Sequence, residues 1–275
     1  MWLKESQSRF ISRRFLAGVL LLTLSIGAIV GTGADRVQAP PLSGTGFRGP
    51  VNAIPSDRPT LRIGVYNIRG GRGTDDRHDL TRTASALRDV QVVGLNEVRG
   101  QGQDDNAGEL GRLLNLPSLF APSERRWWRD SFGNGMLCAL PVEGWVRLPL
   151  PGTQGAGHRT ALLTRVVWND RVVNVLVTHI DRTTDRAVQL RTVIDLFQSL
   201  EPPSVLMGDL NTNRDDEQLQ ALIREGATDA LGTILRERDQ PGRIDWILTR
   251  GLTVTDAGWI DQGASDHPFV WAEVK

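Results

Sequence analysis

The sequence has almost no cysteine: Cys138 is the one cysteine among 275 residues, so no disulfide can form within the chain. A chain of this length can bury a core large enough to be stable without such crosslinks. Cys138 lies in an apolar run at residues 136–140, and the chain has four histidines in all. We therefore expect Cys138 to be a small buried side chain and not a nucleophile, and we expect no structural zinc site.

Net charge is also missing, because 32 basic residues balance 32 acidic ones. Residues 59–275 carry 25 basic and 29 acidic side chains, and this mildly acidic balance lacks the basic footprint of most nucleic-acid-binding proteins. Lysine is nearly absent, since every basic residue except Lys4 and Lys275 is arginine. That preference reflects either a GC-rich genome or bidentate recognition of phosphate by guanidinium groups.

The nucleophile elbow Gly-x-Ser-x-Gly of serine hydrolases is absent as well. Ser265 stands directly before Asp266 and His267, where it does not face the histidine as an attacking serine would. The sequence therefore gives little support to a serine hydrolase.

The N-terminal part contains an uncharged apolar run at residues 15–34. Twenty residues of helix span about 30 Å, the thickness of the hydrocarbon core of a bilayer. Four basic residues and one acidic residue precede the run, so the positive-inside rule keeps the N-terminus in the cytoplasm and exports the remainder. We expect residues 1–34 to be either an uncleaved membrane anchor or a signal that is cleaved to give a secreted or periplasmic protein.

Residues 35–59 are rich in Pro, Gly and Ser and show no apolar periodicity, which predicts a linker. We expect one folded domain over residues 60–275, present as a monomer. Period-two and helical patterns in that part predict a mixed order of strands and helices. Predicted strands cover 61–67, 91–95, 135–140, 143–148, 159–168, 171–178, 204–207, 244–249, 252–259 and 268–274; predicted helices cover 81–89, 105–115, 184–200 and 215–225. This order predicts a four-layer α/β (α+β) sandwich of two packed mixed β-sheets flanked by helices.

Polar residues follow several predicted strands directly where the strands end, which is where α/β sheets place their sites. These residues are Asn67, Glu97, His179, Asp209, Asn211, Asp245, Asp266 and His267. Singly, each is more often a turn or cap residue. Together, four carboxylates in one place are costly unless a cation or a proton resolves the repulsion, and oxygen ligands suit Mg²⁺ or Mn²⁺.

The segments that carry these residues resemble the endonuclease/exonuclease/phosphatase superfamily over about residues 60–275. They are VYNIRGG (65–71), VVGLNEVRG (92–100), FGNGMLCALPV (132–142), HRTALL (158–163), LVTHID (176–181), MGDLNTN (207–213), RIDWIL (243–248) and SDHPFV (265–270). The superfamily includes pancreatic deoxyribonuclease, apurinic endonucleases, neutral sphingomyelinases and inositol-polyphosphate 5-phosphatases. The resemblance implies hydrolysis of a phosphoester by water with the help of Mg²⁺ or Mn²⁺.

The resemblance also implies roles around the metal and the water. Glu97 would be the main metal ligand, with Asn67 beside it and Asp266 near the metal. Asp209 would align or deprotonate the attacking water, and Asn211 would help to position that water and the phosphate.

Further roles implied by the resemblance concern the substrate. His267 would contact the scissile phosphate, and Asp245 would accept a hydrogen bond from it. His179 would stabilise the transition state or the leaving group, while Asn134 and Arg159 would line the substrate cleft.

The sequence departs from its relatives at two positions. Relatives usually have Gln before the metal-binding Glu, and this chain has the shorter Asn96. Where apurinic endonucleases carry an acidic residue after the first Asn, this chain has Arg69. A positive charge there would weaken a second metal position and favour a phosphate-bearing substrate; the alternative is a solvated loop arginine.

The segment Ser123–Arg129 (SERRWWR) combines arginines with two tryptophans. Trp127 and Trp128 could stack on a base or sit at a lipid interface, or they could alternate across an edge strand.

For substrate, we expect a small or lipid-borne phosphodiester or phosphomonoester, with a membrane surface as a further partner. The domain is mildly acidic, the stretch between Asp229 and Asp245 is short, and an anchor would hold the domain near lipid head groups. The alternative is an exported Mg²⁺-dependent nuclease that acts on DNA, and a remote alternative is a binding module without catalysis.

Overall fold

The computed structural model describes residues 36–49, 59–87, 89–102, 104–126, 129–152, 157–235 and 242–275. Internal contacts divide the chain into a main unit, Gln38–Arg125 with Asp130–Lys275, and a small unit, Met1–Val37 with Arg126–Arg129. The predicted signal or anchor at residues 1–34 lies outside the described residues, and so do Trp127 and Trp128. Among the described residues, no helix is long and apolar enough to cross a membrane.

The first sheet of the main unit is built around one parallel pair of strands. In spatial order it contains β6 (Ser118–Arg126), β7 (Ser131–Cys138), β4 (Val92–Gln101), β3 (Leu61–Asn67), β15 (Phe269–Val274) and β14 (Val254–Ile260), and β5 (Asp104–Asp105) pairs with β4. β3 and β4 run parallel, while the other pairs are antiparallel. A further strand, β1 (Arg36–Gln38), includes the last two residues of one segment of the small unit and the first residue of the main unit.

The second sheet repeats this mixed arrangement. Its spatial order is β12 (Thr228–Asp229), β13 (Asp245–Arg250), β11 (Ser204–Asp209), β10 (Arg171–His179), β9 (Thr160–Trp168), β8 (Val142–Pro149) and β2 (Leu42–Gly44). β10 and β11 are parallel and the other pairs are antiparallel.

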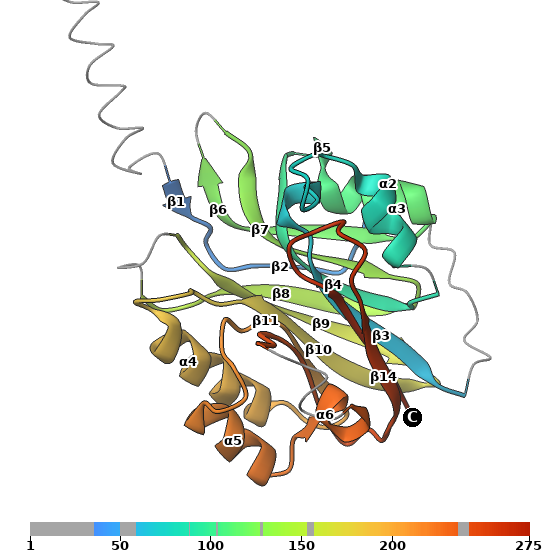
Figure 1. Ribbon diagram of the computed structural model, residues 1–275, viewed down its shortest axis with the longest axis vertical. Helices are drawn as coiled ribbons and strands as arrows, with labels where there is room; N and C mark the ends of the chain where they lie inside the picture. Colours follow the sequence, from blue (N-terminus) through green and yellow to red (C-terminus); the bar gives the residue numbers. More distant parts are fainter. Residues whose placement is uncertain are drawn as a thin grey trace, which may run out of the picture. The chain divides into compact units, whose positions relative to one another are not determined.

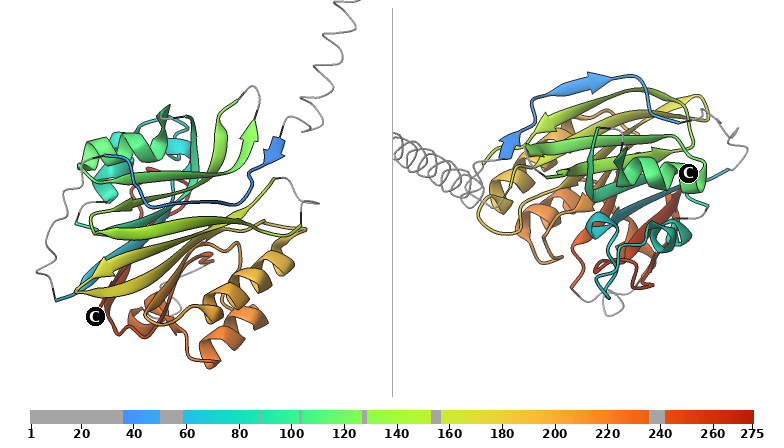
Figure 2. Two further views of the ribbon diagram at one scale, coloured as in Figure 1. Left: turned by 180° about the vertical axis from the view of Figure 1, so that it is seen from behind. Right: turned by 90° about the horizontal axis from the view of Figure 1, so that it is seen from above.

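Helices cover the outer face of each sheet, as Figures 1 and 2 show. α2 (Leu80–Ala86) and α3 (Asn106–Leu114) lie on the first sheet, and α4 (Arg186–Ser199) and α5 (Glu217–Arg224) lie on the second. The short helices η1 (Arg69–Gly71) and α6 (Ala230–Ile234) follow β3 and β12. The structure therefore confirms the predicted sandwich of two mixed sheets flanked by helices.

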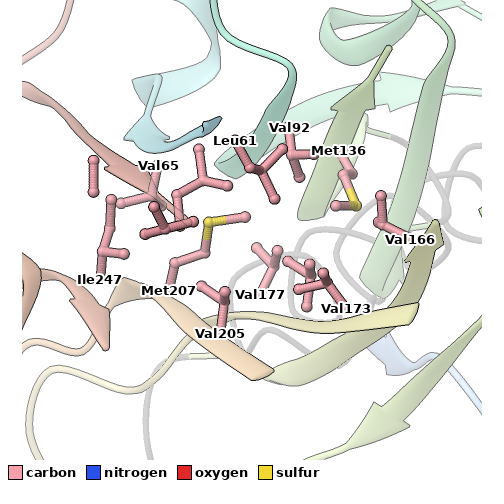
Figure 3. Packing of buried hydrophobic residues seen from close by; sticks show 14 of the residues in the cluster. Leu61, Val65, Val92, Met136, Val166, Val173, Val177, Val205, Met207 and Ile247 are labelled. Atoms are coloured by element: carbon pink, nitrogen blue, oxygen red, sulfur yellow. The ribbon is translucent and has the colours of Figure 1, made fainter. Parts of the chain in front are cut away.

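Alternation along the strands produces the layers, because successive side chains point to opposite faces of a sheet. In β3, Ile63 and Val65 face the core between the sheets, whereas Tyr66 faces the helices of the first sheet. In β10, Val175 and Val177 face the same central core, which Figure 3 shows from close by. Burial on both faces gives these strands continuous apolar runs and fixes their register.

Cys138 is fully buried in the central core, as predicted. Burial raises the pKa of its thiol to about 12, so the thiolate nucleophile is not formed near neutral pH.

The expected linker over residues 35–59 needs a correction. Its described part contains β2, in which Leu42 pairs with Arg147 and Gly44 with Trp145 of β8. The main folded unit therefore begins at Gln38 and not near Thr60. This strand was not predicted because it is short and lies at a sheet edge. Leu42 is 48% exposed there, so the sequence shows no apolar alternation.

Candidate active site

The ends of three neighbouring strands place three ionisable residues side by side. β10 ends at His179 and the parallel strand β11 ends at Asp209, and these two residues are paired in register. β13 runs antiparallel to β11, so its first residue, Asp245, lies opposite Asp209. The register of the second sheet alone therefore brings His179, Asp209 and Asp245 together.

Amide side chains of the first sheet hold Asp209 from the other side. Asn67, the last residue of β3, donates from Nδ2 to Asp209 Oδ2 at 3.0 Å. Asn96 accepts the backbone N–H of Asp209 at 2.9 Å, and its Nδ2 donates to Asn134 Oδ1 at 2.9 Å and to the Thr178 carbonyl at 3.0 Å. These bonds link the two sheets at one edge and fix the position of Asp209.

Asn96 was noted in the sequence only as a departure from relatives, and its bridging position was not predicted. It is fully buried, and a buried amide must satisfy both its donor and its acceptor. The structure shows that the shorter side chain reaches Asn134, Thr178 and Asp209 at once.

Glu97 lies on a β-bulge that changes the direction of β4. Leu95 pairs with Gly135 and Val98 with Gly133, so Asn96 and Glu97 together lie opposite the single residue Asn134. Glu97 adopts φ 56°, a backbone conformation that costs a non-glycine residue free energy and that tends to occur at functional sites. Its carboxylate is half-buried, and no other side chain that the structure describes donates a hydrogen bond to it. It is therefore available to a cation.

Asp209 is almost completely buried and is hydrogen-bonded through both carboxylate oxygens. Oδ1 accepts the backbone N–H of Asn211 at 2.9 Å, and Oδ2 lies 3.4 Å from His179 Nε2 and 3.8 Å from His267 Nε2. Burial and the neighbouring charge of Asp245 raise the pKa of Asp209 to about 6. A carboxylate with such a pKa is suited to accept a proton near neutral pH.

His267 and Asp245 form a close pair. His267 Nδ1 lies 2.7 Å from Asp245 Oδ2, in agreement with the predicted hydrogen bond between them. Burial disfavours the charge on His267, but the hydrogen bond and the charges of Asp245, Asp209 and Asp266 outweigh burial and raise its pKa to about 9. The imidazolium form therefore prevails at neutral pH and directs Nε2 toward Asp209.

His179 has the opposite protonation state. Burial, with the positive charges of Arg159 and His267, holds its pKa well below the usual range, so the ring is neutral at pH 7. Its Nδ1 is buried without a hydrogen-bond partner in the described part of the chain. The Phe132 ring lies 6.2 Å from it between centroids.

Arg159 is a half-buried cation with two buried donors that lack a partner among the described residues. Its Nε and Nη1 are buried and have no hydrogen-bond partner among the described residues. Burial lowers its pKa, while the charges of Glu97, Asp181 and Asp209 oppose that shift. Leaving a charged donor unpaired is costly, so these atoms are suited to an anionic ligand.

The structure pairs Arg69 with residues of this chain. Its guanidinium lies 2.9 Å from Asp76 and 3.6 Å from Asp266, and it donates to the Gly73 carbonyl. Asp266 itself is exposed beside Arg69, at the rim of the site. Both predicted residues therefore lie near the end of β3, but their charges are engaged with each other.

The donor set fits a hard divalent cation. Asp209, Asp245 and His267 have ligand atoms within 4.8 Å of one another. In the structure His267 Nδ1 is hydrogen-bonded to Asp245 Oδ2 at 2.7 Å, so we describe this trio as a hydrogen-bonded cluster. Among the described residues no side chain donates a hydrogen bond to Glu97, and Asn67 pairs in register with the preceding residue, Asn96. The carboxylate and the Asn67 amide oxygen are the kind of ligands that Mg²⁺ or Mn²⁺ prefers.

Comparisons with known proteins agree with this geometry. The sequence pattern of the Endonuclease/Exonuclease/phosphatase family matches residues 64–267. None of the curated proteins matches the chain.

Solved structures show the same fold. One is the endonuclease/exonuclease/phosphatase from Beutenbergia cavernae DSM 12333, at 25% identity over 79% of this chain and 72% of that chain, with a TM-score of 0.67. D. rerio TDP2 complexed with single strand DNA product is 17% identical over 79% and 100% of the two chains, with a TM-score of 0.59. Sphingomyelinase C from Streptomyces griseocarneus is 15% identical over 78% and 99%, with a TM-score of 0.57.

Proposed function

The chain belongs to the endonuclease/exonuclease/phosphatase family, whose members are phosphoesterases and nucleases, and we propose that it hydrolyses a phosphoester bond by metal-assisted attack of water. The observation that carries this proposal is the environment of Asp209. A buried carboxylate with a raised pKa lies between a neutral and a charged histidine, Oδ2 being 3.4 Å from His179 and 3.8 Å from His267. This arrangement places a base next to positive charge, as water attack on a phosphoester requires.

Each residue then has a defined task. Asp209, oriented by Asn67 and the Asn211 backbone, accepts the proton of the attacking water. The imidazolium of His267 donates from Nε2 to a phosphoryl oxygen, and Arg159 places its free donors on the same anion. A divalent cation held by Glu97 and Asn67 would stabilise the negative charge that develops on the phosphoryl group.

We propose that the substrate is a small or lipid-borne phosphodiester or phosphomonoester. Residues 59–275 carry fewer basic than acidic side chains, so long-range attraction to a polyanion such as duplex DNA is weak. D. rerio TDP2 and Sphingomyelinase C share the fold at 17% and 15% identity and act on different substrates, so the fold alone does not select one.

Turnover on three substrates would test this proposal: a sphingomyelin-type phosphodiester in vesicles, a soluble phosphomonoester and plasmid DNA. With Mg²⁺ or Mn²⁺ we expect kcat/KM to be highest on one of the first two. Chelation of the metal should reduce it by at least about a hundredfold, and added metal should restore it, because the metal supplies several kcal/mol of transition-state stabilisation. Unchanged turnover after chelation would contradict metal dependence. Plasmid nicking without turnover of the other two substrates would identify a nuclease.

We also propose that residues 1–14 face the cytoplasm and that residues 60–275 function outside it, as a membrane-anchored or released protein. The support is the uncharged run at residues 15–34 behind four basic residues. An alkaline phosphatase reporter fused after Lys275 should be active, because this reporter folds only after export. Activity of a cytoplasm-specific reporter at the same position would contradict the orientation. The mass of the mature N-terminus distinguishes an anchor from a cleaved signal.

A further inference from the structure

Phe132 lies close to two guanidinium groups at the active site. Arg159 Cζ is 5.4 Å from the centroid of its ring and Arg99 Cζ is 5.6 Å from it. The Phe132 ring is also 6.2 Å from the ring of His179 between centroids. The Phe132 ring therefore contacts two cations and lies next to the ring of His179.

The strand pairing explains why Arg99 points toward the site. Val98 packs in the core between the first sheet and its helices, so its neighbour Arg99 lies on the opposite face. Arg99 pairs in register with Phe132, whose ring reaches His179 on the other sheet. Arg99 is two residues beyond Glu97, which places it about 6–7 Å farther along β4.

Arg99 differs from Arg69 in its lack of an acidic partner among the described residues. Arg69 is held by Asp76 and Asp266, whereas no carboxylate in the described part of the chain lies within ion-pair distance of the Arg99 guanidinium. The Arg99 side chain packs closely over Gly70, where a Cβ atom would lie 2.7 Å from Arg99 Cδ. The backbone of η1 thus leaves room for an exposed cation whose charge is not neutralised.

We propose that Arg99, supported by Phe132, binds a second phosphate of the substrate, next to the phosphoester that is cleaved. This inference rests on the proposed hydrolase function and refines its substrate class to phosphoesters that carry another phosphate nearby. The Nε and Nη1 donors of Arg159 are buried, and its charge interacts with those of Glu97 and Asp209, so we assign Arg159 to the scissile phosphate. Arg99 is exposed at the rim and remains for a different anionic group.

Two pairs of substrates test the proposal, each pair differing by one phosphate. The first is thymidine 5′-(p-nitrophenyl phosphate) with and without a 3′-phosphate. The second is 3-hydroxypropyl p-nitrophenyl phosphate with and without a phosphate on its hydroxyl. We expect the second phosphate to raise kcat/KM by about tenfold, the usual size for one charge-assisted hydrogen-bonded contact. An effect in both pairs identifies the phosphate as the recognised group, and an effect in the thymidine pair alone identifies a nucleotide.

The ratio of kcat/KM with the second phosphate to kcat/KM without it should fall to about one in Arg99→Ala. Hydrolysis of the single-phosphate substrates should change much less, and Arg99→Lys should retain part of the ratio. Arg62→Ala is the matched control, because Arg62 Cζ also lies over an aromatic ring, 4.1 Å from the centroid of Trp271. Arg62 is at the start of β3, whereas the site lies at the end of that strand. Its ratio should equal that of the unaltered protein. A ratio of one in both pairs, or an equal loss on both members of a pair in Arg99→Ala, would overturn the proposal.

Binding without turnover separates this inference from the proposed function. In EDTA, calorimetry should show thymidine 3′,5′-bisphosphate binding about tenfold tighter than thymidine 5′-monophosphate, with the difference lost in Arg99→Ala. If that difference is found and no phosphoester is hydrolysed, the subsite stands and the hydrolase proposal fails. If hydrolysis occurs and the difference is absent from both assays, the subsite fails and the hydrolase proposal stands.

Discussion

Asp209→Asn is expected to lower kcat by about a thousandfold, within the range for loss of a general base. The asparagine amide has nearly the same shape, but it cannot accept the proton of the attacking water. The environment of Asp209 is set by its neighbours, since Asn67, Asn96 and the Asn211 backbone all hydrogen-bond to it. The substitution should therefore leave the fold intact, which the melting temperature and circular dichroism would check.

Asp105→Asn is the matched control for this substitution. Asp105 is also buried, caps α3 by accepting the Gly108 N–H at 2.8 Å, and pairs with Arg48 at 2.6 Å, and neither partner is a proposed catalytic residue. An asparagine still caps α3, but the ion pair with Arg48 is lost, which should lower stability by about 1 kcal/mol and leave kcat unchanged. If Asp209→Asn kept more than a tenth of the unaltered kcat, another group would have to be the base.

The sequence predicted the fold best where burial imposes a period on the side chains. β3 has the predicted bounds, residues 61–67, because both of its faces are buried and the apolar run is continuous. β6 was harder to predict, since Ser123 and Glu124 are buried there although they are polar. The alternation rule assumes that buried positions are apolar, and it fails where polar side chains are buried next to a site.

The candidate site was predicted through the strand ends, and the structure brings most of these residues together. What the sequence does not encode locally is the bulge that places Asn96 and Glu97 opposite Asn134, because this bulge depends on the pairing of β4 with β7. Phe132 was missed for a related reason. A phenylalanine predicts a core position, and its contacts with Arg99 and Arg159 exist only in three dimensions.

The His267–Asp245 pair also couples the site to the stability of the fold. The pKa of His267 is about 9 in the folded protein, against an ordinary value of 6.5. The folded state thus holds a proton that the unfolded state releases between these values. The stabilisation from the pair is complete below pH 6.5 and is lost as the pH rises through about 9. In the protein without metal, Asp245→Asn should flatten this alkaline loss of stability.

His267→Ala is expected to lower kcat by about a hundred- to a thousandfold, as for removal of a donor that stabilises the charge of a transition state. The imidazolium Nε2 lies 3.8 Å from the proposed base, so its charge is positioned where the phosphoryl oxygens would develop theirs. His78→Ala, at an exposed histidine, should leave kcat unchanged. Turnover at the unaltered rate in His267→Ala would show that this assignment is wrong.

Asp245→Asn provides the sharper test of the same role, because it keeps His267 and alters only its protonation. The asparagine oxygen can still accept the Nδ1 hydrogen bond, which is 2.7 Å long in the structure, but the negative charge that raises the His267 pKa is gone. Activity of the unaltered protein should fall on the alkaline side near pH 9, where His267 loses its proton. In Asp245→Asn this fall should move toward the ordinary histidine value of 6.5, so that the variant is most impaired at alkaline pH and least impaired at acidic pH. The pH profile of kcat measures this directly. An alkaline limb that stays in place after loss of the Asp245 charge would mean that His267 is not the titrating acid.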